Sequence, residues 1–148
     1  MSVNWDKRFL ELSEFIAKWS KDRSTGVGVV IADSDNRVVS MGYNGFPSGF
    51  NDDLDYRHNR PQKYLYTEHA ERNAIYNAAR AGLSIKNCTM YLMWFPCADC
   101  ARAIIQSGIS TLVCRKPDFS NETWGNSFAA AFDMLNECKI KLIYIDEE

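Results

Sequence analysis

The stretch that decides the fold runs from His69 to Cys114 and has the sequence HAERNAIYNAARAGLSIKNCTMYLMWFPCADCARAIIQSGISTLVC. It begins with a segment dense in Ala, Glu, Arg and Asn that stops at a glycine, a pattern typical of a helix with a glycine end. A short apolar run follows, and the same alternation then repeats. The expected elements are helices over 69–81 and 97–106 and strands over 89–95 and 110–114. Alternating helices and apolar strands indicate an α/β protein.

The flanking residues extend this pattern in both directions. Apolar residues at steps of three and four predict an amphipathic helix over 4–20, with an apolar face made of Trp5, Phe9, Leu12, Ile16 and Trp19. Further expected elements are a hairpin over 27–32 and 37–43, a helix over 128–137 and a closing strand over 139–145. Residues 50–67 show no clear period, so we expect a long surface loop there. We expect one domain over 1–148, a three-layer α-β-α sandwich around a mixed, roughly five-stranded sheet.

Charge and cysteine content exclude several classes of protein. The 17 basic and 19 acidic residues give a net charge of −2, which argues against a nucleic-acid partner but permits a small phosphorylated ligand. There is no apolar run of about 18 residues, so we expect no membrane span, and residues 1–8 do not resemble a signal peptide. The five cysteines are an odd number, which favours a cytoplasmic protein with reduced thiols.

Two motifs at expected helix starts carry the chemistry: His69-Ala70-Glu71 and Pro96-Cys97-Ala98-Asp99-Cys100. One His and two Cys suit tetrahedral zinc, and three protein ligands leave a fourth position for water, as in catalytic sites. Cys97 begins a helix, where the helix dipole favours a thiolate, and Cys100 follows one turn later. We therefore expect His69, Cys97 and Cys100 to bind a catalytic Zn²⁺.

Glu71 is predicted to transfer protons. A spacing of two residues turns its side chain away from that of His69 on a helix, so the two are poorly placed to bind the same ion. A carboxylate near the ion but not bound to it can accept a proton from the water that zinc acidifies. The pattern H-x-E…P-C-x-x-C is the signature of zinc nucleobase deaminases.

Simpler interpretations of the same residues account for less of the pattern. A C-x-x-C pair alone could be a redox pair, but such a pair needs no His-x-Glu on another helix. A closed structural zinc site would need a fourth ligand, and Cys88, Cys114 and Cys138 are better explained as small buried residues. His58 is most simply a solvated loop residue.

Several short segments together resemble the deoxycytidylate (dCMP) deaminase family. They are Trp19-Ser20-Lys21-Asp22, Val27-Gly28, Gly42-Tyr43-Asn44-Gly45-Phe46-Pro47-Ser48-Gly49, His69 to Ile75 and Phe95 to Ala101. The resemblance is dense from Trp5 to Cys114. It implies a cytidine-deaminase-like fold and hydrolysis of dCMP to dUMP and ammonia at C4 of the cytosine, with zinc on His69, Cys97 and Cys100 and proton transfer by Glu71.

The resemblance also implies contacts with the substrate. The backbone N–H of Ala70 would hold the pyrimidine carbonyl, and Asn44 would contact the sugar. Lys21 and Arg23, in the polar turn after the first helix, are the candidates for the phosphate, although an exposed charge run would look the same. Phe95 or Phe119 could flank the base, unless they are core residues. Arg72 stands where relatives usually have an aliphatic residue.

Regulation is a further implication of the resemblance. Relatives are commonly hexamers activated by dCTP and inhibited by dTTP, so we expect a homo-oligomer, with a hexamer favoured. The loop Gly42–Gly49 resembles the element that binds these effectors, with Mg²⁺ accompanying the nucleotide. The effector candidates are Gly42, Tyr43, Asn44, Gly45, Pro47 and Gly49.

Two other classes of function stay open on the sequence alone. One is a related zinc deaminase that acts on a free nucleoside, a base or adenosine in tRNA, although the net charge of −2 disfavours tRNA. The other is a non-catalytic zinc or nucleotide-binding protein, which would have no use for Glu71.

Overall fold

The computed structural model describes residues 3–145 and contains one mixed sheet of five strands in the order β2-β1-β3-β4-β5. The strands are β1 (Gly28–Ala32), β2 (Val38–Tyr43), β3 (Thr89–Leu92), β4 (Thr111–Cys114) and β5 (Lys141–Tyr144). β1 runs antiparallel to both β2 and β3, whereas β3, β4 and β5 are mutually parallel. All five residues of β1 are buried, because this strand lies inside the sheet with helices on both faces.

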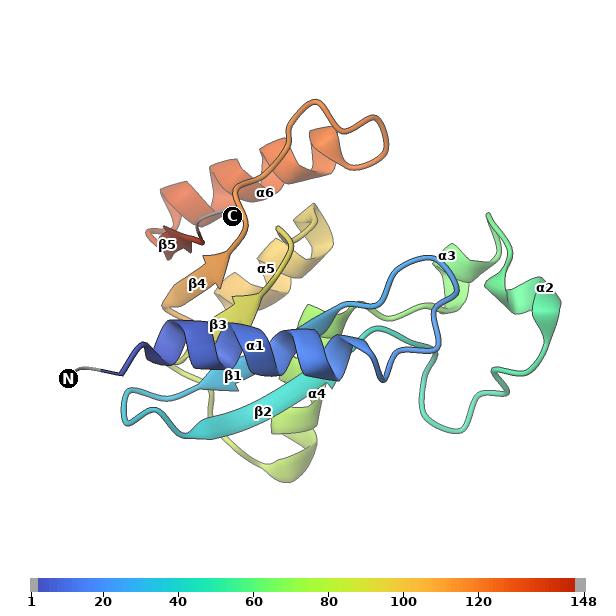
Figure 1. Cartoon of the computed structure of the whole chain (residues 1–148). Helices are drawn as coiled ribbons and strands as arrows, with labels where there is room; N and C mark the ends of the chain where they lie inside the picture. The colour runs from blue at the N-terminus through green and yellow to red at the C-terminus, as the bar shows by residue number, and fades with distance from the viewer. Residues whose placement is uncertain (1–2, 146–148) are drawn as a thin grey trace.

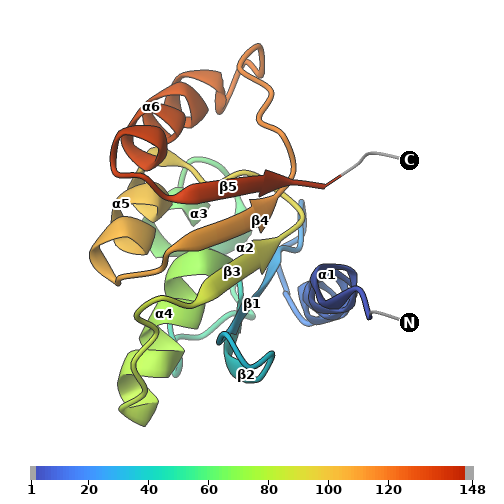
Figure 2. The ribbon, with the colours of Figure 1, turned by 90° about the vertical axis from the view of Figure 1, so that its left-hand side faces the viewer.

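Helices cover both faces of the sheet, as Figures 1 and 2 show. They are α1 (Trp5–Ala17), α2 (Asp55–His58), α3 (Lys63–Tyr66), α4 (Ala70–Ala81), α5 (Ala98–Gln106) and α6 (Gly125–Glu137). α1 alone packs on one face, where Phe9 and Ile16 meet Val30 of β1. α4, α5 and α6 pack on the other face. The expected three-layer α/β sandwich with a mixed five-stranded sheet is thus confirmed.

Some boundaries differ from the sequence predictions. α1 ends at Ala17, so Trp19 lies beyond the helix and its side chain is 52% exposed, outside the core face predicted for it. The stretch 50–67 is not a featureless loop, because it contains α2 and α3. Each of these helices has four residues, which is too short for an apolar period to be visible in the sequence. α6 begins three residues earlier than predicted.

Two single-residue predictions were wrong. Cys138 is exposed at the end of α6, so only Cys88 and Cys114 of the three expected core thiols are buried. His58 is half-buried rather than solvated, because its Nε2 lies 2.6 Å from the carbonyl oxygen of Asp52 and its ring lies 4.9 Å from that of Phe46.

The single domain expected over 1–148 stays a prediction, and residues 1–2 and 146–148 lie outside the described part of the chain. Among the helices between residues 3 and 145, none combines the length and the apolar character that crossing a bilayer requires.

The close packing of α4 against β2 positions the functional residues. Gly42 of β2 has no room for a side chain, since a Cβ there would lie 2.4 Å from the backbone nitrogen of Ala74 and 2.7 Å from the carbonyl oxygen of Ala70. α4 ends at Gly82, which adopts the left-handed backbone with φ 71° that glycine tolerates. The start of α4 therefore lies directly over the sheet, beside the start of α5.

Candidate metal centre and active site

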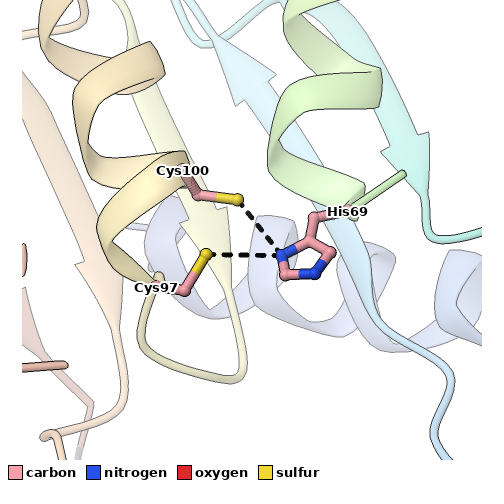
Figure 3. A group of neighbouring side chains, drawn as sticks. All are labelled: His69, Cys97 and Cys100. Carbon is pink, nitrogen blue, oxygen red and sulfur yellow. Dashed lines mark hydrogen bonds between the residues drawn. The ribbon is translucent and has the colours of Figure 1, made fainter. Parts of the chain in front are cut away.

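The three predicted zinc ligands lie at the starts of two neighbouring helices (Figure 3). His69 immediately precedes α4 and Cys97 immediately precedes α5, both with extended backbone. Neither side chain caps its own helix, so both are free to face a ligand. Cys100 lies in the first turn of α5, and its Sγ faces the same point as Sγ of Cys97.

The donor atoms fit a tetrahedral zinc ion. Nδ1 of His69 lies 3.5 Å from Sγ of Cys97 and 3.4 Å from Sγ of Cys100, and all three donor atoms lie within 4.8 Å of one another. Zinc–nitrogen and zinc–sulfur bonds of about 2.0 and about 2.3 Å at a tetrahedral angle would separate the nitrogen from each sulfur by about 3.5 Å. The observed spacing therefore matches the geometry that zinc requires.

The electrostatics of the two thiols also suit a cation. The hydrogen bond with Cys100 is the main cause that lowers the pKa of Cys97, to about 4, and the same contact raises the pKa of the Cys100 thiol. One sulfur is thus a ready thiolate, and a divalent cation would favour the thiolate at the second as well.

Glu71 lies in the first turn of α4, and its side chain is buried beside the thiols and His69. The residue is only 5% exposed, and burial is the main cause that raises the pKa of its carboxyl. A buried carboxyl group with a raised pKa accepts a proton more readily than an exposed one, which suits a proton-transfer group. Glu71 is not among the three residues whose donor atoms converge.

The other predicted substrate residues differ in their surroundings. Ala70 is fully buried in the first turn of α4. Asn44 is 8% exposed, and its side chain joins two backbone segments: Oδ1 accepts from the N–H of Val27 at 2.8 Å and Nδ2 donates to the carbonyl of Thr25 at 2.9 Å. Asn44 therefore has a structural role that the sequence did not reveal.

The two aromatic residues predicted to flank the base lie in different environments. Phe95 is a core residue, 5% exposed, whose ring meets that of Phe128 at 5.8 Å. Phe119 is 50% exposed and packs against Phe132. The aromatic ring beside the metal ligands is instead Trp124, which meets the ring of His69 edge-on at 6.0 Å. Trp124 lies 55 positions from His69, and no local pattern singles it out.

The predicted phosphate residues line a cavity of about 260 Å³ together with the loop residues 43–50. Lys21 pairs with Asp52 at 3.0 Å and Arg23 pairs with Asp55 at 2.9 Å. Of the loop residues proposed to bind effectors, Tyr43, Asn44, Gly45, Pro47 and Gly49 line this cavity, whereas Gly42 packs against α4. The three metal-ligand candidates are not among the residues that line it.

Sequence reasoning missed two further residues of this cavity. Lys63 of α3 is 8% exposed and pairs with Asp22 at 3.2 Å. Thr67, which also lines the cavity, has a buried hydroxyl that meets no hydrogen-bond partner among residues 3–145. Both lie in the stretch taken for a surface loop, where the sequence offers no period from which to place them.

Fold and site together define a class of protein. A mixed sheet between helical layers, with one His and two Cys at adjacent helix starts and a buried Glu beside them, is the arrangement of zinc-dependent nucleobase deaminases. Residues 3–116 match the family described as the cytidine and deoxycytidylate deaminase zinc-binding region. The chain belongs to this family and is a deaminase.

Individual relatives extend over most of the chain. A protein of Aliivibrio fischeri described as an uncharacterized deaminase is 40% identical over 147 residues, covering 98% of this chain and 96% of its own. Human deoxycytidylate deaminase is 35% identical over 137 residues, covering 89% and 76%. The dCMP deaminase of cyanophage S-TIM5, solved in complex with dCMP and dUMP, has a TM-score of 0.78 at 22% identity and covers 98% and 99%, which shows the shared fold.

Proposed function

We propose that this deaminase converts dCMP and water to dUMP and ammonia. The observation that carries the proposal is the convergence of His69 Nδ1 with the sulfurs of Cys97 and Cys100 beside the buried Glu71. The choice of dCMP among related substrates is supported by relatives named deoxycytidylate deaminase that cover most of the chain, the human protein among them.

Each residue of the site would have a separate role in the reaction. A zinc ion bound to the three ligands would lower the pKa of a water molecule to about 7. Glu71 would take up one proton from the attacking water and pass it to N3 of the cytosine, and would then take up the second proton of that water, from the oxygen now on C4, and deliver it to the departing amine. The backbone N–H of Ala70, at the positive end of the α4 dipole, would donate to the pyrimidine carbonyl at C2.

Aromatic and polar contacts would orient the rest of the nucleotide. Trp124 is the better candidate than Phe95 or Phe119 for a wall beside the base, because its ring already contacts His69. Asn44 has hydrogen-bonding capacity beyond its two backbone contacts, since an amide oxygen has two lone pairs and an amide nitrogen has two hydrogens. It could therefore hold the sugar while it joins Val27 to Thr25.

The activity is tested by supplying dCMP, CMP, deoxycytidine and dCTP separately to the zinc-loaded protein and measuring ammonia release. We expect turnover on dCMP to exceed that on the other three. No turnover on dCMP, with or without dCTP and Mg²⁺, would exclude the proposed reaction. Equal turnover on deoxycytidine would indicate a nucleoside deaminase.

We further propose that the 260 Å³ cavity binds the regulatory nucleotides dCTP and dTTP, with Mg²⁺ on the triphosphate. Three cations, Lys21, Arg23 and Lys63, line it, and the unpartnered hydroxyl of Thr67 offers a donor. The metal ligands do not line this cavity, whereas Asn44, the candidate for the substrate sugar, does, so the cations must be tested against both the substrate phosphate and the phosphates of an effector.

One variant tests whether the cations of this cavity bind the phosphates of an effector or the phosphate of the substrate. In Lys21→Gln we expect the rise in melting temperature caused by dCTP with Mg²⁺ to shrink while KM for dCMP changes less than twofold. Lys86→Gln, an exposed lysine outside the cavity, serves as the control. A raised KM with an intact response to dCTP would instead assign Lys21 to the substrate phosphate.

We also propose a homo-oligomer, with a hexamer favoured, located in the cytoplasm. The aromatic side chains of Phe15, Trp19 and Tyr43 are about half exposed, and Trp19 contacts both of the others. They offer an apolar surface for a second copy of the chain. The five free cysteines suit a reducing compartment. Sedimentation equilibrium of the zinc protein tests the oligomer, and a monomer at all concentrations would contradict it.

A further inference from the structure

Four charged side chains link the starts of α4 and α5, the two elements that carry the metal ligands. Arg72 of α4 donates from Nε to Glu68, the residue before His69, and its Nη1 lies 3.6 Å from Oδ2 of Asp99 on α5. Asp99 lies between the two cysteines in the sequence and also pairs with Arg102. Arg72 is therefore the member of this group that reaches both helix starts.

The carboxylate of Glu68 is itself tied to the metal-ligand backbone. Its Oε1 accepts from the N–H of His69 at 3.2 Å as well as from Arg72. The side chains of Arg72 and Glu68 are 20% and 28% exposed, so this pair is partly removed from water, where a charge-assisted contact has more weight than on an open surface.

Apolar packing also holds the two helices together. Both helices contribute to one apolar cluster, α4 with Ala70, Ala74 and Ala78 and α5 with Ala101 and Ile104. Apolar burial is non-directional, so it favours the approach of the two helices more than the orientation of an individual ligand side chain. The contacts of Arg72 are directional and lie at the level of the ligands.

We propose that Arg72 is a positioning residue for the metal centre. By holding Glu68 on one side and Asp99 on the other, it keeps Nδ1 of His69 at the distance from the two sulfurs that zinc requires. The inference rests on the proposed zinc site. A planar guanidinium with several donors can contact two carboxylates at once, which a lysine ammonium does less well.

The test measures zinc release rather than turnover alone. The zinc-loaded wild type, Arg72→Gln, Arg72→Lys and the control Arg102→Gln are mixed with excess chelator, and the release rate is followed. Arg102→Gln removes a contact of Asp99 within α5 but leaves the link between the helices. We expect Arg72→Gln to release zinc at least about tenfold faster, since loss of a residue that orients metal ligands typically weakens metal binding by that much. Arg102→Gln should stay within twofold of the wild type.

The lysine variant distinguishes positioning from charge. If Arg72 acts through its contacts to both carboxylates, Arg72→Lys should release zinc nearly as fast as Arg72→Gln. A wild-type rate in Arg72→Lys would show that positive charge suffices and would overturn the positioning role. Equal rates for Arg72→Gln and Arg102→Gln would overturn it as well.

Two further measurements distinguish loss of ligand positioning from a general loss of folding. Combining Arg72→Gln with Asp99→Asn should accelerate zinc release by less than the product of the two single effects, because each change removes the same link. The kcat of Arg72→Gln should fall while KM changes little. A wild-type protein that holds no zinc would instead refute the proposed metal site itself, which is a different outcome from unchanged release in the Arg72 variants.

Discussion

His69 and Glu71 are two positions apart at the start of α4, yet the structure gives them different surroundings. The ring of His69 faces the sulfurs of Cys97 and Cys100, whereas Glu71 is the more deeply buried of the pair. Removal of the His69 side chain should therefore have a different effect from removal of the Glu71 side chain. The metal should depend on His69, and proton transfer should depend on Glu71.

Glu71→Gln keeps the size of the side chain and removes its ability to carry a proton. We expect the variant to hold about one zinc per chain and to lose activity by a factor of about 10² to 10⁴, the range that general acid–base groups contribute. Metal analysis and ammonia release on the same preparation check this. Loss of zinc from Glu71→Gln would mean that the residue helps to hold the ion.

Asn44 illustrates a residue whose structural role is visible only in three dimensions. Asn44→Ala would leave the N–H of Val27 and the carbonyl of Thr25 without their partner. We expect a loss of about 1–3 kcal/mol in the free energy of unfolding, measured in urea on the zinc-loaded protein. Asn77→Ala is the control, because Asn77 is exposed and makes one side-chain contact, to the carbonyl of Met41. Equal losses in both variants would contradict this role.

At the scale of elements, the spacing between β2 and α4 controls where the active site lies. Gly42 and Gly45 occur in one motif of the sequence, but they differ in their surroundings. A Cβ at Gly42 would meet the backbone of α4, whereas a Cβ at Gly45 would have nothing within 4 Å. Both glycines lack the left-handed backbone that only glycine tolerates well, so the difference is one of space.

This difference predicts contrasting effects of one added methyl group. Gly42→Ala should lower the free energy of unfolding by about 1–3 kcal/mol or more and reduce activity, because α4 must move away from β2. Gly45→Ala should leave the stability within about 0.5 kcal/mol, as expected for a site without packing conflicts. Urea unfolding and ammonia release measure the two effects. A stable, active Gly42→Ala protein would show that α4 can shift without disturbing the ligands.

At the scale of the whole molecule, the segment 51–67 is joined to the body by a partly buried ion pair. The side chains of Asp22 and Lys63 are each 10% exposed. Burial alone would raise the pKa of Asp22, but hydrogen bonds from the backbone of Thr25 and Ser24 and from Lys63 outweigh it and lower the pKa. The pair lies at the cavity proposed for effectors.

A lowered pKa in the folded state makes stability depend on pH in a definite direction. The stabilisation from Asp22 is complete above the unfolded pKa of about 3.9 and is lost as pH falls through the lower folded value. We therefore expect Asp22→Asn to be less stable than the wild type at pH 7, with a difference that shrinks below about pH 4. Urea unfolding at several pH values measures this. A constant difference from pH 7 to pH 3 would contradict it.

Much of the fold was predictable because its signals are local. The order of helices and strands follows from apolar spacing and from glycines such as Gly82, which end an element wherever they occur. The predictions failed where the period was too short or was interrupted. α2 and α3 have only four residues each, and Trp19 continues the apolar spacing of α1 although the helix has already ended.

The candidate site likewise contains residues that could be predicted from local sequence spacing and residues that could not. His69, Glu71, Cys97 and Cys100 could be predicted because each pair lies within one turn of a helix, where spacing in the sequence decides which side chains share a face. Trp124, Lys63 and the link from Arg72 to Asp99 could not, since these contacts join segments that only the packed sheet brings together.

By itself the sequence therefore determined the fold class, the family and the set of candidate zinc ligands, because residue types and their spacing encode these. Only the tertiary structure decided which of two similar glycines sets the position of α4, which aromatic ring lies beside the metal ligands, and which cations share a cavity. The physical reason is that packing, burial and charge pairing depend on distances in space between residues far apart in the chain.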